Sequence, residues 1–217
     1  RSAMSFDDEL LRKREALIQD GFEPYPYSFD RTSDLAGVRE RSDELMDQVV
    51  RVAGRLTAYR GKGKMIFADI ADQRARLQLM FRKNEFDEAG WDVVRRKLDV
   101  GDWIGVSGPL FVTKMGELSV EVKELTVLAK TTVRVPIPKS KDDQTFFQLA
   151  DPETRYRERY LHWVTDSDAR EVMVQRARTI SSIRRFLEGR GFLEVTTPTI
   201  EMNYGGAEAR PFVTQIQ

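Results

Sequence analysis

The sequence has no cysteine and a single histidine among its 217 residues. The first absence excludes disulfide bonds and thiolate metal sites, and the second argues against a histidine-based metal centre or catalytic triad. No stretch approaches the roughly 20 consecutive apolar residues that a transmembrane helix needs. The N-terminal residues are acidic and polar, whereas a secretion signal is basic and then apolar. We therefore expect a cytoplasmic protein with no membrane contact.

The chain also lacks an excess of charge of either sign, because 35 lysine and arginine residues balance 35 aspartate and glutamate residues. A polyanion would then have to be bound through a local cluster of cations and not through the net charge. With 41% hydrophobic and 32% charged residues, the composition is that of an ordinary globular protein. The length allows one large or two modest domains.

Five stretches in the middle of the chain alternate apolar and polar residues with the period of two that is typical of half-buried β-strands. They cover residues 48–58, 64–71, 75–83, 101–113 and 117–128. Between the third and fourth stretches, residues 84–99 place apolar side chains at roughly helical spacing. Three strands, a helix and two strands is the order of an OB-fold, a small five-stranded barrel. We therefore predict an OB-fold over residues 48–130.

The alternation also predicts which side chains face the interior of this barrel. The inward set is Ile66, Ala68, Ile70, Leu77, Leu79, Phe81, Leu118, Val120 and Val122. The outward set then includes an aromatic ring (Phe67), an amide (Gln78) and, at the start of the fifth stretch, a carboxylate (Glu117). The cations in or beside the first three strands are Arg55, Arg60, Lys62, Lys64, Arg74 and Arg76.

Stacking aromatic rings within a basic groove are the means by which OB-folds hold single-stranded bases. The outward face is therefore a candidate nucleic-acid interface. Two alternatives stay open at this point: Phe67 could belong to the core, and the cations could form an ordinary solvated surface.

The residues on either side of the predicted barrel differ in character. Residues 1–47 form a lead-in with an amphipathic helix predicted over 5–20, followed by the segment PYPYSF (24–29), whose prolines predict an extended backbone. Residues 131–160 contain three prolines and a polar stretch, and they are predicted to be a linker.

Residues 161–217 are predicted to begin a second domain. A long helix is predicted over residues 168–189, with an apolar stripe and glycines at its end, and a short strand is predicted over 192–200. One helix and one strand do not close a hydrophobic core. We therefore expect this range to be part of a larger α+β domain.

The end of that helix and the residues after it, RRFLEGRGFLEVTTPTI (184–200), resemble motif 1 of the class II aminoacyl-tRNA synthetases. The matching positions are Gly191, Phe192, Val195 and Pro198, and Thr199 is a weak match. An OB-fold ahead of motif 1 is typical of the enzymes for aspartate, asparagine and lysine. Three further stretches are similar to the lysyl-tRNA synthetases, namely PYPYSF (24–29), RYRERYL (155–161) and GGAEARPF (205–212).

The resemblance implies roles for matching residues. In this family the OB-fold binds the tRNA anticodon, and the aromatic, amide and arginine that meet the central uridine fall on Phe67, Gln78 and Arg60. The carboxylate that meets a neighbouring anticodon base falls on Glu117. Motif 1 forms the interface of a homodimer. The loop Gly205-Gly206-Ala207 resembles the one that lines the lysine pocket, although a plain turn is the alternative for two adjacent glycines.

The activity implied is that of a lysine–tRNA ligase, which uses ATP and Mg²⁺ to activate lysine and then transfers it to tRNA. The arginines of motifs 2 and 3 and the acids that hold magnesium do not occur within this sequence. We therefore expect the chain to bind lysine tRNA without catalysing alone, and we assign it no catalytic or metal-binding residue. The alternatives are an aspartyl- or asparaginyl-tRNA synthetase and a non-catalytic OB-fold module that binds nucleic acid.

Overall fold

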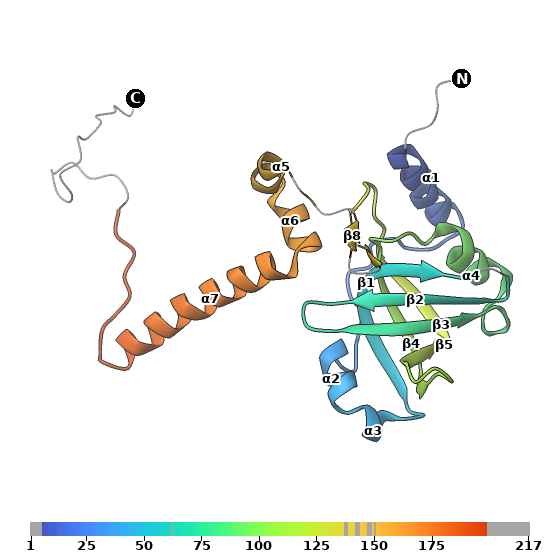
Figure 1. Ribbon diagram of the computed structural model, residues 1–217, viewed down its shortest axis with the longest axis horizontal. Coiled ribbons are helices and arrows are strands. Elements are labelled where there is room, and N and C mark those ends of the chain that lie inside the picture. The colour runs from blue at the N-terminus through green and yellow to red at the C-terminus, as the bar shows by residue number, and fades with distance from the viewer. Residues whose placement is uncertain are drawn as a thin grey trace. The chain divides into compact units, whose positions relative to one another are not determined.

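The computed structural model of the chain describes residues 6–61, 63–136, 139–141, 144–146, 149 and 151–198. The chain divides into two compact units, Arg1–Ser167 and Asp168–Gln217. The first unit is built around a closed β-barrel with short helices on its outside, and the second contains one long helix (Figure 1).

Five strands close the barrel, as the alternating pattern predicted. They are β1 (Val49–Arg60), β2 (Met65–Ala71), β3 (Arg76–Arg82), β4 (Trp103–Val112) and β5 (Leu118–Val122). Strands β1, β2 and β3 are antiparallel neighbours, β3 runs parallel to β5, and β5 is antiparallel to β4. Pairing of β4 with β1 closes the circle. This strand order confirms the predicted OB-fold.

The last predicted strand, 117–128, is not one strand in the structure. It breaks at Lys123 into β5 and an additional strand β6 (Glu124–Ala129), which also pairs with β4. The pairing register moves by one residue at the break, from Leu110↔Val120 in β5 to Ser107↔Glu124 in β6. At Gly108 a β-carbon would collide with the backbone carbonyl of β5, so glycine permits this close approach.

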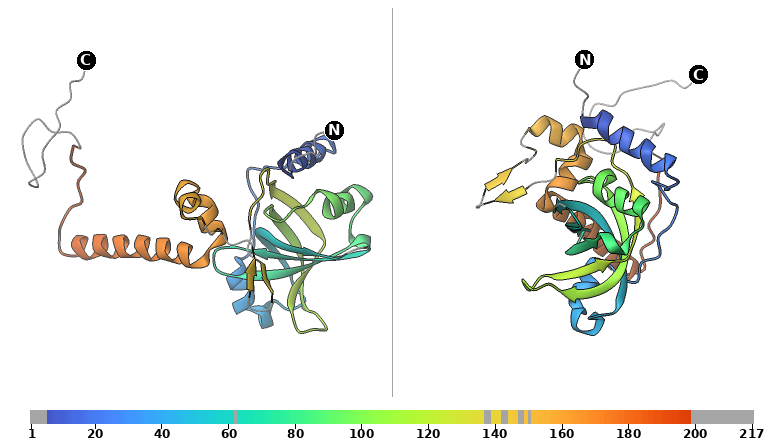
Figure 2. Two further views of the ribbon diagram at one scale, coloured as in Figure 1. Left: turned by 45° about the horizontal axis from the view of Figure 1, so that its top comes forward. Right: turned by 90° about the vertical axis from the view of Figure 1, so that its right-hand side faces the viewer.

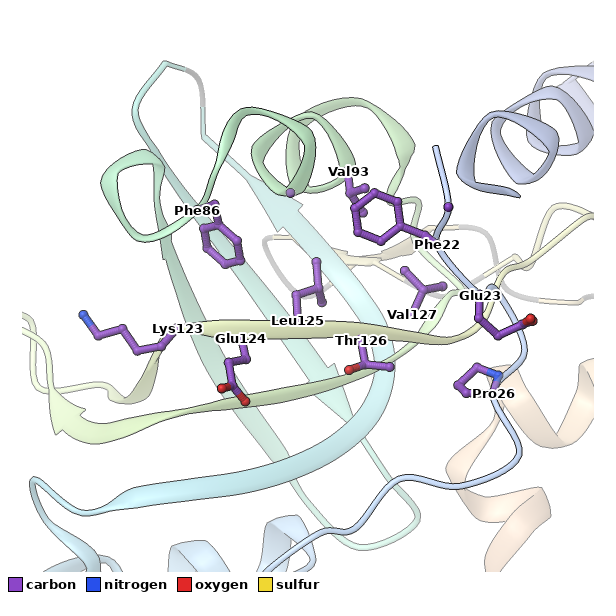
Figure 3. A pocket seen from close by; sticks show the side chains of 12 residues that line it. Phe22, Glu23, Pro26, Phe86, Val93, Lys123, Glu124, Leu125, Thr126 and Val127 are labelled. Carbon is purple, nitrogen blue, oxygen red and sulfur yellow. The ribbon is translucent and has the colours of Figure 1, made fainter. Parts of the chain in front are cut away.

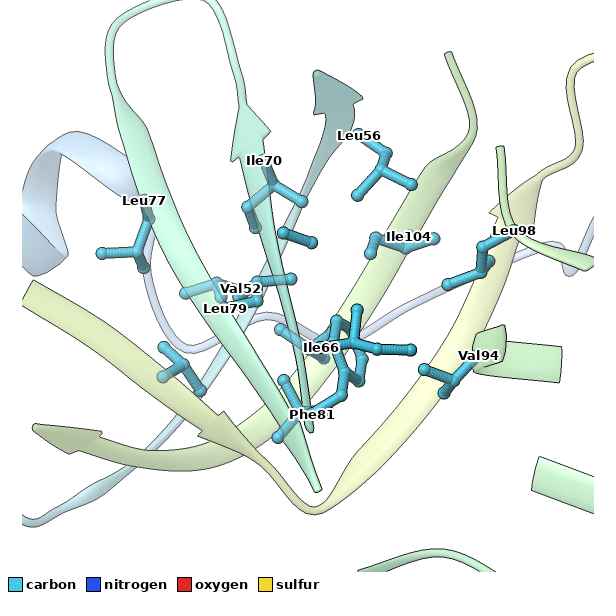
Figure 4. Close-up of a cluster of buried hydrophobic side chains, with 14 of the residues drawn as sticks. Val52, Leu56, Ile66, Ile70, Leu77, Leu79, Phe81, Val94, Leu98 and Ile104 are labelled. Carbon is cyan, nitrogen blue, oxygen red and sulfur yellow. The ribbon is translucent and has the colours of Figure 1, made fainter. Parts of the chain in front are cut away.

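The connection between β3 and β4 is helical, as predicted, but it consists of three short pieces. These are η1 (Lys83–Glu85), α4 (Glu88–Asp92) and the π-helical turn η2 (Val93–Lys97). Asp87 caps α4 by accepting a hydrogen bond from the Gly90 backbone N–H at 2.7 Å. Val94 of η2 and the following Leu98 point toward the side chains inside the barrel (Figure 4).

The barrel interior holds the apolar set that the alternation predicted. Ile66, Ala68, Ile70, Leu77, Leu79, Phe81, Val120 and Val122 are all buried, and Leu118 packs against them from a partly exposed position. Phe81 is the largest side chain that is fully buried (Figure 4). Phe67 is only half-buried and is not part of this core, so the alternative that placed it there is wrong.

The lead-in residues pack on the outside of the barrel. Helix α1 (Phe6–Gln19) contributes Leu17 to the core, and α2 (Leu35–Glu40) and α3 (Ser42–Leu45) lie at another side (Figures 1 and 2). Between them Phe29 lies on Gly105 of β4, where a β-carbon would come within 2.6 Å of the ring. The ring of Phe29 is thus held directly against the sheet.

A buried charge network joins α1, the start of β4 and the end of β6. The Lys130 side chain is fully buried and donates to Asp99 at 2.6 Å and to Asp102 at 2.9 Å. Asp102 also accepts the backbone N–H of Thr131, and Lys13 of α1 donates to Asp99 at 2.6 Å. Burial raises the pKa of Asp102, and the Lys130 ammonium opposes that shift.

Beyond the barrel the chain forms the antiparallel strands β7 (Lys139–Lys141) and β8 (Gln144–Phe146), then α5 (Pro152–Arg157) and α6 (Arg159–Thr165). Part of the predicted linker is therefore regular structure. Asp151 caps α5 by accepting the Thr154 backbone N–H at 2.8 Å.

The second unit contains the predicted long helix, α7 (Ser167–Glu188). Gly191 ends it with a φ of 84°, and Phe192 N–H reaches back to the Leu187 carbonyl, as in a Schellman motif. The strand predicted over 192–200 is wrong for residues 192–198, which form no strand pairing with any other segment that the structure describes. A strand needs hydrogen bonds to a neighbouring strand, and its apolar alternation alone does not supply them. No helix in the described ranges is long and apolar enough to cross a membrane.

The Lys130–Asp102 pair generates a stability prediction. The substitution Lys130→Met leaves the Asp102 carboxylate fully buried without its cation, so we expect the free energy of unfolding to fall by about 3–5 kcal/mol. Urea unfolding followed by circular dichroism measures this. The deficit should shrink as the pH is lowered, because a protonated Asp102 no longer needs the ammonium group.

The matched control is Lys123→Met, which removes an ammonium group that is 39% exposed and paired with Glu85 and Glu121. An exposed pair of this kind contributes at most about 1 kcal/mol. Equal losses in the two variants would contradict the role given to Lys130.

Candidate nucleic-acid interface

The outward side of the barrel brings the predicted base-binding residues onto one surface. In the sheet register Arg60 of β1 lies opposite Phe67 of β2, which in turn lies opposite Met80 of β3. One step along the strands, Asp69 of β2 lies opposite Gln78 of β3, which lies opposite Ser119 of β5. Successive rows on one face of a sheet are ~7 Å apart. We call this surface the outer face.

Glu117 completes the predicted set at the edge of this surface. It is exposed and lies just before β5, two residues ahead of Ser119 and therefore on the same side of the strand. Its backbone N–H is held by the Thr113 hydroxyl at 3.1 Å across the β4–β5 turn. The outer face thus carries Arg60, Phe67, Gln78 and Glu117 on four neighbouring strands or strand ends.

Asp69 organises the cations of the outer face. Its side chain is only 6% exposed, and a single carboxylate oxygen accepts from Arg60 at 2.9 Å and from Arg76 at 2.6 Å. The side chains of both arginines are nevertheless more than half exposed. The carboxylate therefore holds two arginines at the surface, and Arg60 reaches the row of Gln78 by this pairing.

The sequence did not single out Asp69. In the sequence it is one acid among many cations. The feature that could have revealed its role is that it occupies an outward position of β2 between Phe67 and Ala71. Alternation predicts which face a side chain occupies, but it does not predict how deeply that face is covered. Asp69 faces outward and is nevertheless buried by the arginines that it binds.

The oxygen of the Gln78 amide accepts a hydrogen bond within the protein. The Ser119 hydroxyl lies 2.9 Å from Gln78 Oε1 and donates to it. Within the described part of the chain, Gln78 Nε2 makes no hydrogen bond. Ser119 itself is completely buried although it faces outward, and the sequence did not identify it as a site residue. The amide nitrogen is thus the polar group that Gln78 offers to a ligand.

The other predicted cations differ from the expectation of a free basic groove. Arg74 pairs with Asp34 at 3.5 Å and Glu40 at 3.8 Å, so it serves the contact between the β2–β3 turn and α2. Arg55 donates to the Gly101 carbonyl and lies over the Trp103 ring. Lys64 is exposed, and Lys62 falls outside the described residues. Only part of the predicted cluster is therefore available at the outer face.

A separate pocket of about 390 Å³ lies between η2, β6 and the lead-in chain (Figure 3). Its lining includes Phe22, Phe86, Val93, Leu125 and Val127, with Lys123 and Glu124 at its rim. It contains none of the predicted base-binding residues. The candidate interface is therefore an open, curved sheet surface, which suits stacking of an exposed base better than enclosure of a small molecule.

In the second unit, the predicted motif 1 residues follow α7. Gly191 provides the left-handed turn at the helix end, and the side chains of Phe192 and Val195 are 64% and 67% exposed. Pro198 is the last residue described. The predicted pocket residues Gly205, Gly206 and Ala207 lie outside the described residues.

No group of three or more His, Asp and Glu side chains that could hold a metal ion comes together among the residues that the structure describes.

Comparison with known proteins finds two family models in the chain, one over the barrel and one over the residues from α5 onward. Residues 50–128 match the family model of the OB-fold nucleic acid binding domain, and residues 151–217 match the model of tRNA synthetases class II (D, K and N).

Curated relatives match along nearly the whole chain. Lysine–tRNA ligase 2 of Methanosarcina mazei is 42% identical over 213 residues, which cover 97% of this chain and 40% of that protein. Lysine–tRNA ligase of Moorella thermoacetica is 44% identical over 204 residues, which cover 94% of this chain and 40% of that protein. The chain thus spans about two fifths of the length of these relatives. It carries an OB-fold domain ahead of a class II synthetase segment and belongs to the lysine–tRNA ligase family of the class II aminoacyl-tRNA synthetases.

Proposed function

We propose that the protein acts in the ATP-dependent attachment of lysine to its tRNA, in the cytoplasm, and that this chain supplies the anticodon-binding part. We also propose the domain division that the sequence predicts. It consists of a lead-in (1–47), an OB-fold (48–130), a linker (131–160) and a segment of the catalytic domain (161–217).

The observation that carries this proposal is the arrangement of Phe67, Gln78 and Arg60 on the outer face. Phe67 lies outside the core and directly opposite Arg60 in the register, and Gln78 is one row away. A half-exposed ring can stack on a base while an amide and a guanidinium reach its pairing edge. Uracil presents two carbonyl oxygens and one N–H on that edge, which are groups that these side chains can match.

Glu117 and Arg76 both extend the same surface beyond the row of Gln78, on the side away from Phe67, because Gln78 lies opposite Ser119 in the parallel register of β3 and β5. A carboxylate accepts hydrogen bonds from the amino groups of a base, so we assign Glu117 to a base next to the central one. Arg76, held by Asp69, presents a guanidinium that suits a phosphate or a base edge. The surface is therefore large enough for more than one nucleotide of a single-stranded loop.

Catalysis belongs to the larger domain of which residues 161–217 are a segment. We assign ATP and Mg²⁺ to that domain, where bound Mg²⁺ would stabilise charge on the phosphoryl groups. The lysine pocket would be completed there by the backbone of Gly205, Gly206 and Ala207, because glycine allows a substrate to approach closely.

We accordingly expect the 217-residue chain to show no lysine-dependent ATP–pyrophosphate exchange, because the nucleotide-binding arginines of the family do not occur in it. The assay is run beside an active lysine–tRNA ligase as the positive control. Exchange that requires both lysine and this chain would contradict the expectation.

Two other functions are less well supported. An aspartyl or asparaginyl enzyme would use a similar OB-fold, but the relatives described above are lysine–tRNA ligases at about 40% identity over nearly the whole chain. A non-catalytic OB-fold module would not need residues 151–217, which match a class II synthetase model. Amino-acid activation by the full-length protein separates these possibilities.

The central prediction concerns anticodon reading. We expect this chain to bind lysine tRNA more tightly than a copy whose central anticodon uridine is replaced by cytidine, by about tenfold at fixed salt. Phe67→Ala should weaken binding of the natural tRNA by about 1–3 kcal/mol, because it removes the stacking surface. Fluorescence anisotropy titrations measure both effects.

The control for Phe67→Ala is Tyr27→Ala, which removes a fully exposed aromatic ring of the lead-in segment. It should leave both affinities unchanged. If the two tRNAs bind alike and only the salt concentration changes the affinity, the barrel is a phosphate binder and the base-reading roles must be withdrawn.

We also propose that the second unit forms a homodimer through motif 1. Helix α7 exposes an apolar stripe that includes Val172, Ile180, Ile183 and Leu187, and the exposed Phe192 and Val195 continue it beyond the helix end. Ile183 and Leu187 also line a shallow groove on this helix. A stripe of this kind in water favours association with a second apolar surface.

Ile183→Lys should shift the chain toward a monomer, because it places a charge in the apolar stripe. Glu188→Lys introduces the same side chain about 140° around the helix, given ~100° per residue, and should leave the dimer intact. Sedimentation across a dilution series measures the mass. A mass that grows steadily with concentration and passes that of a dimer would contradict a defined interface.

A further inference from the structure

Ser119 is the one completely buried polar side chain on the outer face. It occupies the row of Asp69 and Gln78, so that Gln78 is flanked by Asp69 on one side and Ser119 on the other. Its hydroxyl lies 2.9 Å from Gln78 Oε1 and 3.2 Å from the backbone carbonyl of Glu117. The shorter hydrogen bond connects it to the amide that is proposed to read a base.

A serine hydroxyl has one proton, so it can donate to only one of these two oxygens at a time. When it donates to Gln78 Oε1, the amide oxygen is occupied and the nitrogen faces the ligand. When it donates to the Glu117 carbonyl, the amide can turn, donate from its nitrogen to the serine oxygen, and present its own oxygen to the ligand. The two arrangements offer a base opposite hydrogen-bonding groups.

Asp69 biases this choice. It is the cross-strand neighbour of Gln78, and its carboxylate favours the N–H end of a nearby amide over the carbonyl end. The observed bond from Ser119 to Oε1 is consistent with that bias, since it leaves the nitrogen free. Both neighbours therefore favour the same orientation of the amide.

We propose that Ser119 is a positioning residue that fixes the Gln78 amide with its nitrogen toward the bound base and thereby selects uridine against cytidine. The inference rests on the proposed function, in which the outer face reads the central anticodon base. Uracil and cytosine differ at position 4, where uracil has a carbonyl oxygen and cytosine has an amino group. A fixed N–H donor bonds the carbonyl and opposes the amino group, whereas an amide free to turn accommodates both.

The test measures the affinities of the wild-type chain and of Ser119→Ala for lysine tRNA and for the copy with a central cytidine, at one salt concentration. In the variant we expect the uridine-to-cytidine affinity ratio to fall by about three- to tenfold, the effect of one hydrogen bond. The fall should come mainly from tighter binding of the cytidine copy, because the released amide can turn its oxygen toward the amino group.

A double-mutant cycle with Gln78→Ala identifies the route of the effect. If Ser119 acts through the amide, Ser119→Ala should leave the ratio unchanged in the Gln78→Ala background. Ser107→Ala is the matched control, because Ser107 is also a buried serine but belongs to β4 and pairs with Glu124 of β6. It should leave the ratio of the wild-type chain unchanged.

Several outcomes would overturn the inference. An unchanged ratio in Ser119→Ala, with or without an equal loss of affinity for both tRNAs, would assign Ser119 a purely structural role. A fall in the ratio that persists in the Gln78→Ala background would also overturn it. If the wild-type chain does not distinguish the two tRNAs, the proposed function itself fails at this face, which is a result distinct from the other two.

Discussion

The structure depends on the closure of the barrel by a single strand that pairs with two neighbours. Strand β1 hydrogen-bonds to β4 over residues 49–55 and to β2 over residues 55–60. A strand shared in this way must bend, and the bend occurs at Gly54 and at the bulge between Leu56 and Ala58. At Gly54 a β-carbon would lie 3.1 Å from the Ala71 carbonyl oxygen, so a side chain there would require the neighbouring strand to shift by a few tenths of an ångström.

Closure also explains the position of the buried charges. At the bend, the Leu56 N–H bonds to the carbonyl of Asp102 and the Leu56 carbonyl accepts the N–H of Gly101, so the loop before β4 completes the hydrogen bonds of β1. The side chain of Asp102 is thereby drawn into the protein, where the Lys130 ammonium compensates its charge. Barrel closure and the charge network are therefore coupled, because both require the loop at Gly101–Asp102 to lie against β1.

Much of this fold could be predicted from the sequence because a period of two, interrupted once by helical spacing, is a strong pattern. The same pattern correctly separated Phe67 and Gln78 from the core. It could not predict the break at Lys123, which follows from a one-residue register shift against β4. Nor could it identify Asp69, Asp102 or Lys130 as buried, because a charged residue is expected at the surface unless its partners are known.

The buried carboxylate of Asp69 changes how the outer face can recognise nucleic acid. Arg60 and Arg76 share one carboxylate oxygen, and Arg82 pairs with Glu121 at 3.3 Å, so the cations of this surface are largely compensated locally. A surface of this kind neutralises few phosphates and gains little affinity from the release of counterions. Its selectivity must then come from the orientation of the groups that contact a base. Holding each such group in place from beneath, as Asp69 holds Arg60 and Ser119 holds Gln78, is the physical requirement of that kind of recognition.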